Sequence, residues 1–342
     1  IGISFYTFQQ IGFLIDVFKG NIKKFNLIDY SLFVSFFPQL IAGPIVKFKD
    51  FLSQIKSNSY TPLNSIYLSN GITIFIIALF KKIVIADSLA RNIEPFYQAI
   101  SLGFNTSIPV AWLSTIAYSL QIYFDFSAYS EMAIGLGLIF GLKLPINFNS
   151  PYQSSSLIEY WNRWNITLSN FFREHLYTPI FLNLSRQTSL SFANHIYSLI
   201  ITMTILGFWH GANWNCIIFG IIHGLGLALN HISKQKNLFK FLPKWFNKLI
   251  LLNFVNLTFV FFKSSNLQIS KSVIGSLLPF NKLKLLSTWN SLQVTDEYSF
   301  SITTIVLIFL LLNVVIFFPS SLSLTGYIYN ESKNNRMISV IE

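Results

Sequence analysis

The chain has 342 residues, of which 52% are hydrophobic and only 11% are charged, and its formal net charge is +11. A soluble domain has about a quarter of its residues charged, so this chain has too few charges to cover a water-facing surface. The composition excludes a soluble globular protein and predicts a polytopic membrane protein.

The basic residues lie in short runs between apolar segments. These runs are Lys19, Lys23 and Lys24; Lys47, Lys49 and Lys56; Lys81, Lys82 and Arg91; and the lysines between residues 234 and 248. Such placement is typical of loops on the cytoplasmic side of a membrane, next to anionic lipids. We therefore expect membrane lipids as partners and no nucleic acid. The single Cys216 excludes an intramolecular disulfide and a cysteine metal cluster.

The first two apolar stretches differ in kind. Residues 1–15 form an apolar run with no charged segment before it and no cleavage site. They are therefore not a signal peptide, and we expect further helices to precede them. Residues 29–46 are apolar but broken by Pro38, Gly43 and Pro44, with basic runs at both ends. One straight span would separate those runs across the membrane, so we predict a re-entrant hairpin that returns to the cytoplasmic face.

The remaining apolar runs have the length and composition of membrane helices. They cover residues 63–80, 108–124, 127–142, 190–208, 212–231, 246–262 and 300–318. The first ends at a lysine pair, Lys81 and Lys82, whose side chains can extend to the membrane interface. Residues 264–298 are more polar and predict a loop with a short helix, and the tail after Pro319 is expected to fray. The fold class is therefore all-α, with roughly seven or eight elements that enter the membrane.

Residues 151–182 form a different kind of segment. Ser156 and Glu159 have the spacing of a capping box that begins a helix. Apolar residues, two tryptophans among them, then recur at three- and four-residue spacing, and Glu159 and Arg163 are an i, i+4 pair. The pattern predicts one amphipathic helix at the membrane interface.

Three of the five histidines lie in the apolar stretch 200–231, His210 and His223 among them. An ionisable group at membrane depth is costly and by default marks a functional site. The alternative is a neutral histidine held by hydrogen bonds in the core. The two residues are 13 positions apart, about 220° around a continuous helix and ~20 Å along it. Because they would share a site only if the helix breaks between them, we expect no metal.

Asp125, Glu131, Lys81 and Lys82 are the other charged residues in apolar surroundings. The carboxylates fit two interpretations, a structural pairing with a lysine or arginine and a role in a substrate or proton path. The lysines are either interface anchors or a pair that meets the phosphate of an anionic donor. The chain has no Gly-x-Ser-x-Gly motif and no Gly-rich phosphate loop, which argues against a serine hydrolase and a nucleotide hydrolase.

Six sequence blocks carry a resemblance to a known family. They are Gly-Ile-Ser-Phe-Tyr-Thr-Phe-Gln (2–9), Phe-Pro-Gln-Leu-Ile-Ala-Gly-Pro-Ile (37–45), Leu-Phe-Lys-Lys-Ile-Val-Ile-Ala-Asp (79–87), Tyr-Phe-Asp-Phe-Ser-Ala-Tyr-Ser-Glu-Met-Ala-Ile-Gly (123–135), Tyr-Trp-Asn-Arg-Trp-Asn-Ile-Thr-Leu-Ser (160–169) and Gly-Phe-Trp-His-Gly-Ala-Asn-Trp (207–214). Together they resemble the membrane-bound O-acyltransferases, and within them the alginate O-acetylation (AlgI-like) branch, which is related to a D-alanyl transfer branch. The resemblance indicates a single transmembrane domain over residues 1–342, strong over 1–245 and weaker over the C-terminal helices and loop of 246–342.

The resemblance implies a ring of tilted transmembrane helices with re-entrant segments around a central tunnel, in a bacterial cytoplasmic (inner) membrane. Acetyl-coenzyme A or another acyl thioester would serve as donor substrate, with no bound cofactor. The acceptor would be a hydroxyl of an exported polysaccharide such as alginate. A periplasmic or extracellular partner of the SGNH-esterase type would complete the transfer.

The resemblance also implies roles for particular residues. His210 matches the family's histidine and would be the general base, and His223 would support it. Relatives usually read Trp-Arg-Arg-Trp-His where this chain has Trp-Asn-Arg-Trp-Asn, so Asn165 replaces a second histidine. We expect its amide to polarise the thioester carbonyl or to orient His210. The residues expected to line the tunnel are Trp209, Trp161, Trp164, Arg163, His223, Asn213 and Asp125.

The resulting prediction is a membrane O-acyltransferase that works in polysaccharide biosynthesis by O-acetylation. One alternative is D-alanyl or other acyl transfer to a cell-wall polymer or glycolipid. An alternative of another class is a transporter or flippase for a lipid-linked substrate, which would have matching broken helices in two halves. A third is a copy made inactive by the change to Asn165 or by a missing N-terminal part.

Overall fold

The computed structural model describes residues 2–40, 43–57, 64–104, 106–237, 242–278 and 300–327. The regular elements within these ranges are all helices, which confirms the all-α class. They are α1 (Gly2–Phe18), α2 (Leu27–Ser35), η1 (Phe37–Gln39), α3 (Phe48–Ile55), α4 (Ser65–Phe80), η2 (Lys81–Ala86), α5 (Asp87–Ser101), α6 (Ile108–Ile139), η3 (Pro151–Gln153), α7 (Leu157–Trp161), α8 (Ile166–Phe172), η4 (Arg173–Tyr177), α9 (Thr178–Gln187), α10 (Ser191–His210), α11 (Trp214–Gln235), α12 (Lys244–Lys263), α13 (Leu267–Leu277), α14 (Ile302–Phe317) and α15 (Ser321–Leu324).

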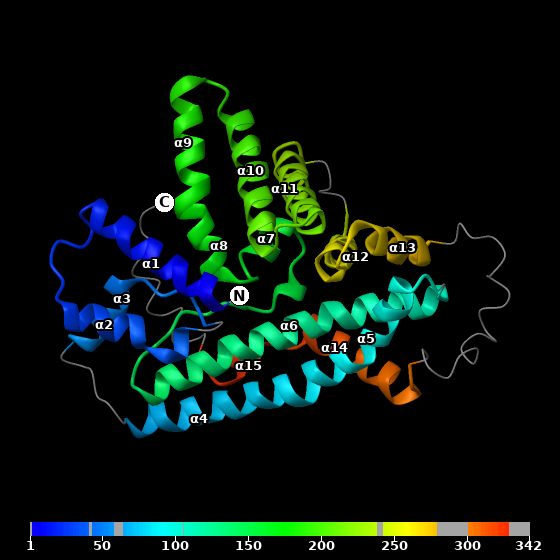
Figure 1. Cartoon of the computed structure of the whole chain (residues 1–342), viewed down its shortest axis with the longest axis horizontal. Helices are drawn as coiled ribbons and strands as arrows, with labels where there is room; N and C mark the ends of the chain where they lie inside the picture. Colours follow the sequence, from blue (N-terminus) through cyan, green and yellow to red (C-terminus); the bar gives the residue numbers. More distant parts are fainter. Residues whose placement is uncertain are drawn as a thin grey trace.

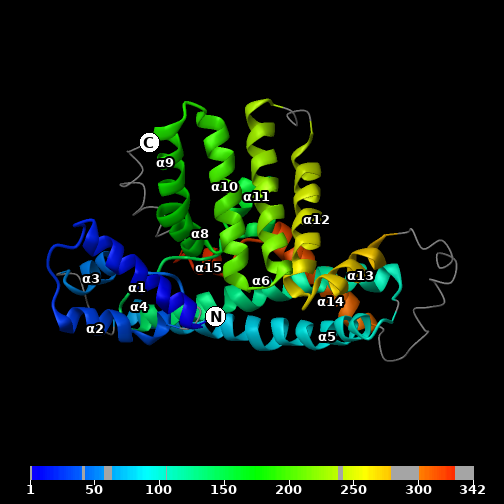
Figure 2. The same cartoon turned by 45° about the horizontal axis from the view of Figure 1, so that its top comes forward.

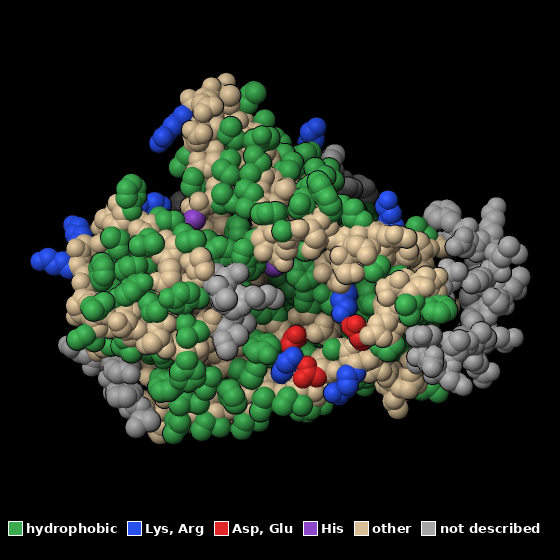
Figure 3. Space-filling model, viewed as in Figure 1, with side chains coloured by type: hydrophobic (Ala, Val, Ile, Leu, Met, Phe, Trp, Pro, Cys, Tyr) green, Lys and Arg blue, Asp and Glu red, His purple; other side chains and the backbone are tan. Residues whose placement is uncertain are grey.

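The helices form a long base and an upright group. In the base, α4 and α5 run along α6, while α9, α10, α11 and α12 stand side by side across it (Figures 1 and 2). Helix α1 and the two short helices α2 and α3 lie together at one end of the base (Figure 1). Hydrophobic side chains cover much of the face in Figure 3, as expected for a chain in contact with lipid.

The base contains one long helix where the sequence predicted two. Residues 108–124 and 127–142 were expected as separate helices, but α6 continues without a break from Ile108 to Ile139. The prediction was wrong because the Asp125 carboxylate needs no gap in the helix: Lys82 lies 2.8 Å from it. A paired carboxylate can remain on a continuous helix at modest cost.

The lysine pair continues a helix instead of ending one. The helix predicted over 63–80 is present as α4, which ends at Phe80. The helical run does not stop there, however, because it continues through the π-helical turn η2 into α5. Lys81 Nζ lies 2.7 Å from Glu131 Oε1 and is only 7% exposed. The structural interpretation of Asp125 and Glu131 as partners of lysines is confirmed.

The segment 29–46 is broken as predicted. Helix α2 ends at Ser35, and the single 3-10 turn η1 contains Pro38. Extended chain follows from residue 43 to α3. Inside the turn, the buried Gln39 amide donates to the Phe33 carbonyl at 2.7 Å, which satisfies a carbonyl at the end of α2. Its return to the cytoplasmic face stays a prediction.

The segment 151–182 is several helices and not the single amphipathic helix that was predicted. The cap is present, since Ser156 Oγ accepts from the Glu159 N–H at 3.1 Å and Glu159 Oε2 accepts from the Ser155 N–H at 2.9 Å. The 2.9 Å ion pair between Arg163 and Glu159 is present as well. However, Asn165 has φ 43° and ψ 55°. A left-handed residue ends a helix and turns the chain, so α7 and α8 are separate.

The two helices predicted around residues 209–213 are confirmed as α10 and α11, and their backbones approach closely. A Cβ placed on Gly207 would lie 2.9 Å from the Gly220 Cα, and a Cβ placed on Gly220 would lie 2.3 Å from the Met203 carbonyl oxygen. Small residues at a helix crossing permit such contact in membrane proteins. The crossing fixes the end of α10, where His210 lies.

Among the described helices, three are long and apolar enough to cross a membrane: α10, α11 and α12, with α14 as a shorter apolar helix. The other membrane-entering elements counted from the sequence do not meet this criterion of length and hydropathy. Helix α13 is the short helix expected in 264–298, and the rest of that loop from 279 onward lies outside the described residues. The tail after Pro319 begins with the short helix α15, and its last part, 328–342, also lies outside them.

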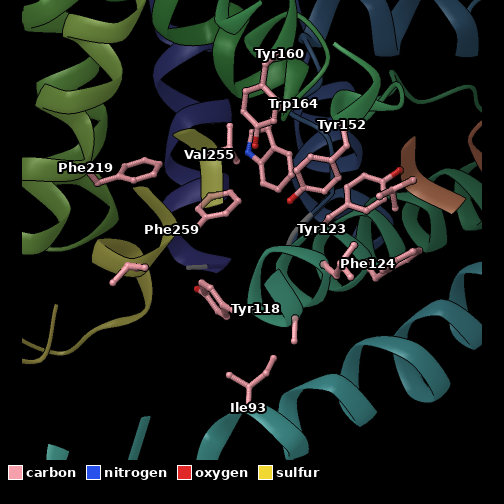
Figure 4. Packing of buried hydrophobic residues seen from close by; sticks show 14 of the residues in the cluster. Ile93, Tyr118, Tyr123, Phe124, Tyr152, Tyr160, Trp164, Phe219, Val255 and Phe259 are labelled. Carbon is pink, nitrogen blue, oxygen red and sulfur yellow. The ribbon is translucent and has the colours of Figure 1, made fainter. Parts of the chain in front are cut away.

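The main core lies where the upright group meets the base. Tyr160, Trp164, Tyr152 and Tyr123 form a row of rings that runs from α7 to α6, with Phe259 of α12 beside it (Figure 4). The Tyr160 and Trp164 rings stack with centroids 5.5 Å apart. Aromatic rings of this size supply much of the apolar area that holds such a junction together.

Candidate active site

His210 is the last residue of α10, immediately before the chain breaks at residues 211–213. Its ring packs against Trp209 (centroids 4.7 Å apart), Phe262 (5.0 Å) and Phe219 (6.3 Å). Within the part of the chain that the structure describes, no hydrogen bond engages either ring nitrogen. His210 is therefore half-buried among aromatic rings with both nitrogens free for a substrate.

His223 is the opposite case. It is 1% exposed, and its Nδ1 accepts a hydrogen bond from the Trp161 indole N–H at 3.2 Å. The proton must then be on Nε2, which donates to Thr258 Oγ1 at 3.0 Å, while the Thr258 hydroxyl donates to the Val255 carbonyl at 2.9 Å. Each N–H and O–H in this series of hydrogen bonds donates to an acceptor, so the His223 imidazole is held as a single neutral tautomer. This geometry fits the expected supporting role of His223.

Asn165 lies at the start of α8 and is 3% exposed. Its backbone is held against residues 147–149: the Ile166 N–H donates to the Asn147 carbonyl at 2.9 Å, and the Asn149 N–H donates to the Arg163 carbonyl at 3.0 Å. Its side-chain Oδ1 is buried without a partner. No hydrogen bond joins Asn165 to His210 among the described residues, so the amide does not orient the imidazole directly in this structure.

Two of the three tryptophans expected at the tunnel are core residues. Trp161 is 8% exposed and packs on His223. Trp164 is 7% exposed and stacks on Tyr160 (Figure 4). Trp209 is different, because it is half-buried and touches both His210 and Phe8 of α1. Of the three, only Trp209 lies directly beside the candidate base.

The other expected tunnel residues hold the framework. Arg163 pairs with Glu159 at 2.9 Å. Asn213 caps α11, since its Oδ1 accepts from the Cys216 N–H at 3.0 Å. Asp125 lies 2.8 Å from Lys82. Each of these groups already has a structural partner.

One interpretation of Lys81 and Lys82 was that they bind the phosphate of an anionic donor. Lys81 is paired with Glu131 in the core, and Lys82 is shared between Asp87 at 2.7 Å and Asp125 at 2.8 Å. Both ammonium groups are therefore neutralised, which does not favour the phosphate role.

A cavity of about 800 Å³ lies between α1, α3, α4 and η4, and nothing in the sequence pointed to it. Its wall includes Gln9, which is 4% exposed with Nε2 unpaired, and His175, whose Nδ1 is also unpaired. Burial lowers the pKa of the His175 imidazole. Burial also raises the pKa of the neighbouring Glu174 carboxyl, but the Lys47 ammonium at 2.5 Å outweighs it and the net shift is downward. The cavity wall combines aromatic and aliphatic side chains with charged and polar ones, and a concave space of this kind can receive a small molecule.

The cavity adjoins His210 through a layer of aromatic rings. Phe8 and Phe171 both line the cavity, with ring centroids 4.7 Å apart. The Phe8 ring lies 5.2 Å from that of Trp209, which lies 4.7 Å from the His210 ring. The sequence block 2–9 contains Phe8, but its contact with Trp209 joins residues about two hundred positions apart and has no local signal.

The described residues contain no group of three or more His, Cys, Asp or Glu side chains that could hold a metal ion. The geometry instead presents one histidine with free nitrogens, beside a cavity large enough for a small organic substrate. Such an arrangement suits acid–base chemistry on a bound substrate. The class of protein is therefore a multi-pass membrane protein with a candidate acid–base residue, His210, at a helix break.

Comparison with known proteins identifies the class more closely. A model of the membrane-bound O-acyltransferase (MBOAT) family matches residues 4–270. The chain belongs to the membrane-bound O-acyltransferase family.

Three relatives show how similar the chain is to individual proteins of this family. The chain is 41% identical to a peptidoglycan O-acetyltransferase of Helicobacter pylori, over 83% of this chain and 58% of the relative. It is 39% identical to a probable alginate O-acetylase AlgI of Pseudomonas putida, over 91% of this chain and 61% of the relative. It is 33% identical to a teichoic acid D-alanyltransferase of Streptococcus thermophilus, over 70% of this chain and 59% of the relative. The chain thus spans about three fifths of the length of the curated relatives it matches.

Proposed function

We propose that this chain transfers an acyl group, most simply acetyl, from a cytoplasmic thioester to a hydroxyl of an exported polysaccharide. The observation that carries the proposal is the contrast between the two central histidines. His223 has both nitrogens hydrogen-bonded, whereas His210 has neither engaged among the described residues and lies one aromatic layer from the cavity. Membership of the O-acyltransferase family supports the same assignment.

In the proposed reaction His210 acts as general base. Its free ring nitrogen accepts the proton of the acceptor hydroxyl while the hydroxyl oxygen bonds to the acyl carbon of the thioester. The carbon–sulfur bond then breaks, and the imidazolium returns the proton to the departing thiolate. The products are an ester and a free thiol, so atoms and charge balance without a metal. A positioned base of this kind contributes about 10²–10⁴-fold to a rate.

The rings around His210 supply the conditions that this step needs. Trp209, Phe219 and Phe262 surround the imidazole, and they exclude water that would otherwise hydrolyse the thioester. Among the described residues no hydrogen bond engages the side-chain amide of Asn165, so its N–H groups are available to a substrate. An amide N–H of Asn165 directed at the thioester carbonyl would stabilise the oxyanion that develops there.

The acceptor polymer is the finer part of the proposal. The relatives named above act on peptidoglycan, alginate and teichoic acid by their names, and the O-acetyl enzymes have the higher identity. We propose O-acetylation of peptidoglycan or of an alginate-like polymer, with D-alanyl transfer as the alternative. The donor is acetyl-coenzyme A or an acyl carrier, the location is the bacterial inner membrane, and an SGNH-esterase-like partner outside the membrane takes part.

The test is an assay in membrane vesicles that contain the full-length gene product. Labelled acetyl-coenzyme A is supplied, and free coenzyme A and label in purified polymer are both measured. His210→Ala should lower both signals by at least about 100-fold while the protein remains in the membrane. His231→Ala is the matched control: it removes the same residue type near the C-terminal end of α11, away from the break at residues 211–213, and should retain the wild-type signal.

Three other results would change the conclusion. Full activity in His210→Ala removes the assigned base. Label from D-alanyl thioester but not from acetyl-coenzyme A moves the chain to the D-alanyl alternative. Activity that appears only in Asn165→His marks this copy as inactive by substitution. The transporter alternative has no support from the family match.

A further inference from the structure

The cavity has the features of the donor side of the proposed reaction. Its wall carries three basic residues, Lys47, Lys143 and Arg173, and three acidic ones, Asp16, Asp50 and Glu174. Lys47 belongs to a basic run that the charge distribution assigns to the cytoplasmic side. The Arg173 guanidinium donates to the Asn162 side-chain oxygen at 3.0 Å. Lys143 Nζ lies over the Tyr67 ring, 5.4 Å from its centroid. Neither of these two cations is bound to a carboxylate in the described residues. They can therefore meet an anionic group of a thioester donor.

The wall of the cavity also contains a buried amide. Gln9 follows Phe8 on α1 and carries a buried Nε2 without a partner. An amide donor in an otherwise apolar wall is costly unless a ligand accepts its hydrogen bond. Because a coenzyme A or carrier arm contains amides, Gln9 offers it a matching group.

Beyond this point the cavity is closed by aromatic rings. Phe8 and Phe171 form its wall toward His210, and Phe172, 6% exposed, lies behind them with its ring 5.5 Å from Phe8. Trp209 then fills the space between Phe8 and the imidazole. An acyl group that enters from the cavity meets these rings before it reaches the base.

We propose that Phe8 and Phe171 are specificity-determining residues: they shorten the donor cavity next to Trp209 and restrict the transferred acyl group to a short one. The proposal rests on the proposed function, because it assumes that the cavity receives the thioester. Close-packed aromatic rings leave little room for additional methylene groups, and forcing them in is unfavourable. A hydrophobic wall of this kind discriminates by about 10-fold or more for each methylene.

The experiment is a competition in vesicles that contain the full-length protein. Acetyl-coenzyme A and butyryl-coenzyme A with different labels are supplied together, and the ratio of the two acyl groups on the polymer is measured. Because both donors compete for the same enzyme molecules, the ratio does not depend on how much of a variant is folded. The expected result is at least a tenfold rise in the butyryl-to-acetyl ratio for Phe8→Ala and for Phe171→Ala.

Phe5→Ala is the matched control. Phe5 lies one turn earlier on α1, is 2% exposed and also contacts Trp209, with centroids 5.8 Å apart. It does not belong to the wall of the cavity, so its removal should leave the ratio unchanged. Phe8→Trp adds volume at the wall and should lower the transfer of propionyl relative to acetyl.

The outcomes separate the inference from the function. If the wild-type protein transfers acetyl and the Phe8 and Phe171 variants keep its ratio, the inference is overturned and the proposed function stands. A rise in Phe5→Ala equal to that in Phe8→Ala would also overturn it, because general loosening around Trp209 would explain both. If the wild-type protein transfers no acyl group from any donor, the proposed function itself fails.

Discussion

The Trp161 indole donates to Nδ1 of His223 across 3.2 Å and thereby joins two helices that are 62 residues apart in sequence. Trp161 ends α7 and His223 lies in the middle of α11. Through Nε2 the same imidazole reaches Thr258 of α12. One neutral histidine thus connects the segment that contains Asn165 to both helices that flank His210.

Trp161→Phe should destabilise the protein. It leaves the buried Nδ1 of His223 without its donor, which costs about 1–3 kcal/mol. Trp164→Phe is the matched control, because Trp164 is equally buried but its indole makes no hydrogen bond among the described residues. Thermal unfolding of the purified protein in detergent measures both. Equal losses would mean that packing, and not the hydrogen bond, makes the contribution of Trp161.

Gly220→Ala should weaken the crossing of α10 and α11. The added methyl would lie 2.3 Å from the Met203 carbonyl oxygen, and relieving that overlap costs about 1–3 kcal/mol. Separation of the helices would also displace His210, so acyl transfer should fall with the melting temperature. Gly275→Ala on α13 is the control, and its effect on stability should have the opposite sign, because no atom lies within 4 Å of the added Cβ. There alanine should stabilise the helix by about 0.5–1 kcal/mol.

Lys81→Met should leave the Glu131 carboxylate buried without its counterion. Glu131 is 4% exposed and lies 2.7 Å from Lys81, and breaking such a pair costs about 3–5 kcal/mol. Lys56→Met breaks an ion pair whose lysine side chain is 57% exposed, and exposed pairs contribute about 0–1 kcal/mol.

Denaturation midpoints should therefore differ clearly between the two lysine variants. The double variant Lys81→Met with Glu131→Leu should recover much of the loss, since no unpaired charge remains. A double variant that is less stable than Lys81→Met alone would contradict this explanation.

Asn165→Gly tests whether the amide or the backbone conformation of Asn165 matters. Glycine adopts the left-handed conformation at φ 43° without strain, so the fold should persist. If the amide stabilises the oxyanion, acyl transfer should fall by about 100-fold.

The matched control is Asn237→Gly, because Asn237 is an exposed asparagine with φ 53° and should tolerate the change without effect on activity. Unchanged activity in Asn165→Gly would show that only the backbone turn is needed.

The sequence predicted part of the arrangement well, for reasons that are local. Apolar runs that flank residues 209–213 predicted α10 and α11, because a glycine and an asparagine stop one helix and cap the next. Pro38 predicted the break after α2, since a proline disrupts helical hydrogen bonds wherever it occurs. The capping residues Ser156 and Glu159 were equally readable.

Other predictions were wrong because a residue far away in the sequence determines the local structure. Asp125 marked a boundary in the sequence, but Lys82 neutralises it and α6 runs on. Asn165 looked like part of a continuous amphipathic helix, but it takes a left-handed conformation. The backbone groups of its neighbours Arg163 and Ile166 are hydrogen-bonded to residues 147–149. Neither partner can be read from local periodicity.

By itself the sequence determined the membrane class, the helical content and the candidacy of His210, because composition, helix-length apolar runs and a histidine between them are properties of contiguous residues. Only the tertiary structure decided which histidine is free. His223 and His210 are the same residue type in neighbouring apolar surroundings, and they differ because Trp161 and Thr258 reach the first and no described polar side chain engages the second. Hydrogen bonds and cavity walls arise from contacts between residues far apart in the chain, so they exist only once the chain has folded.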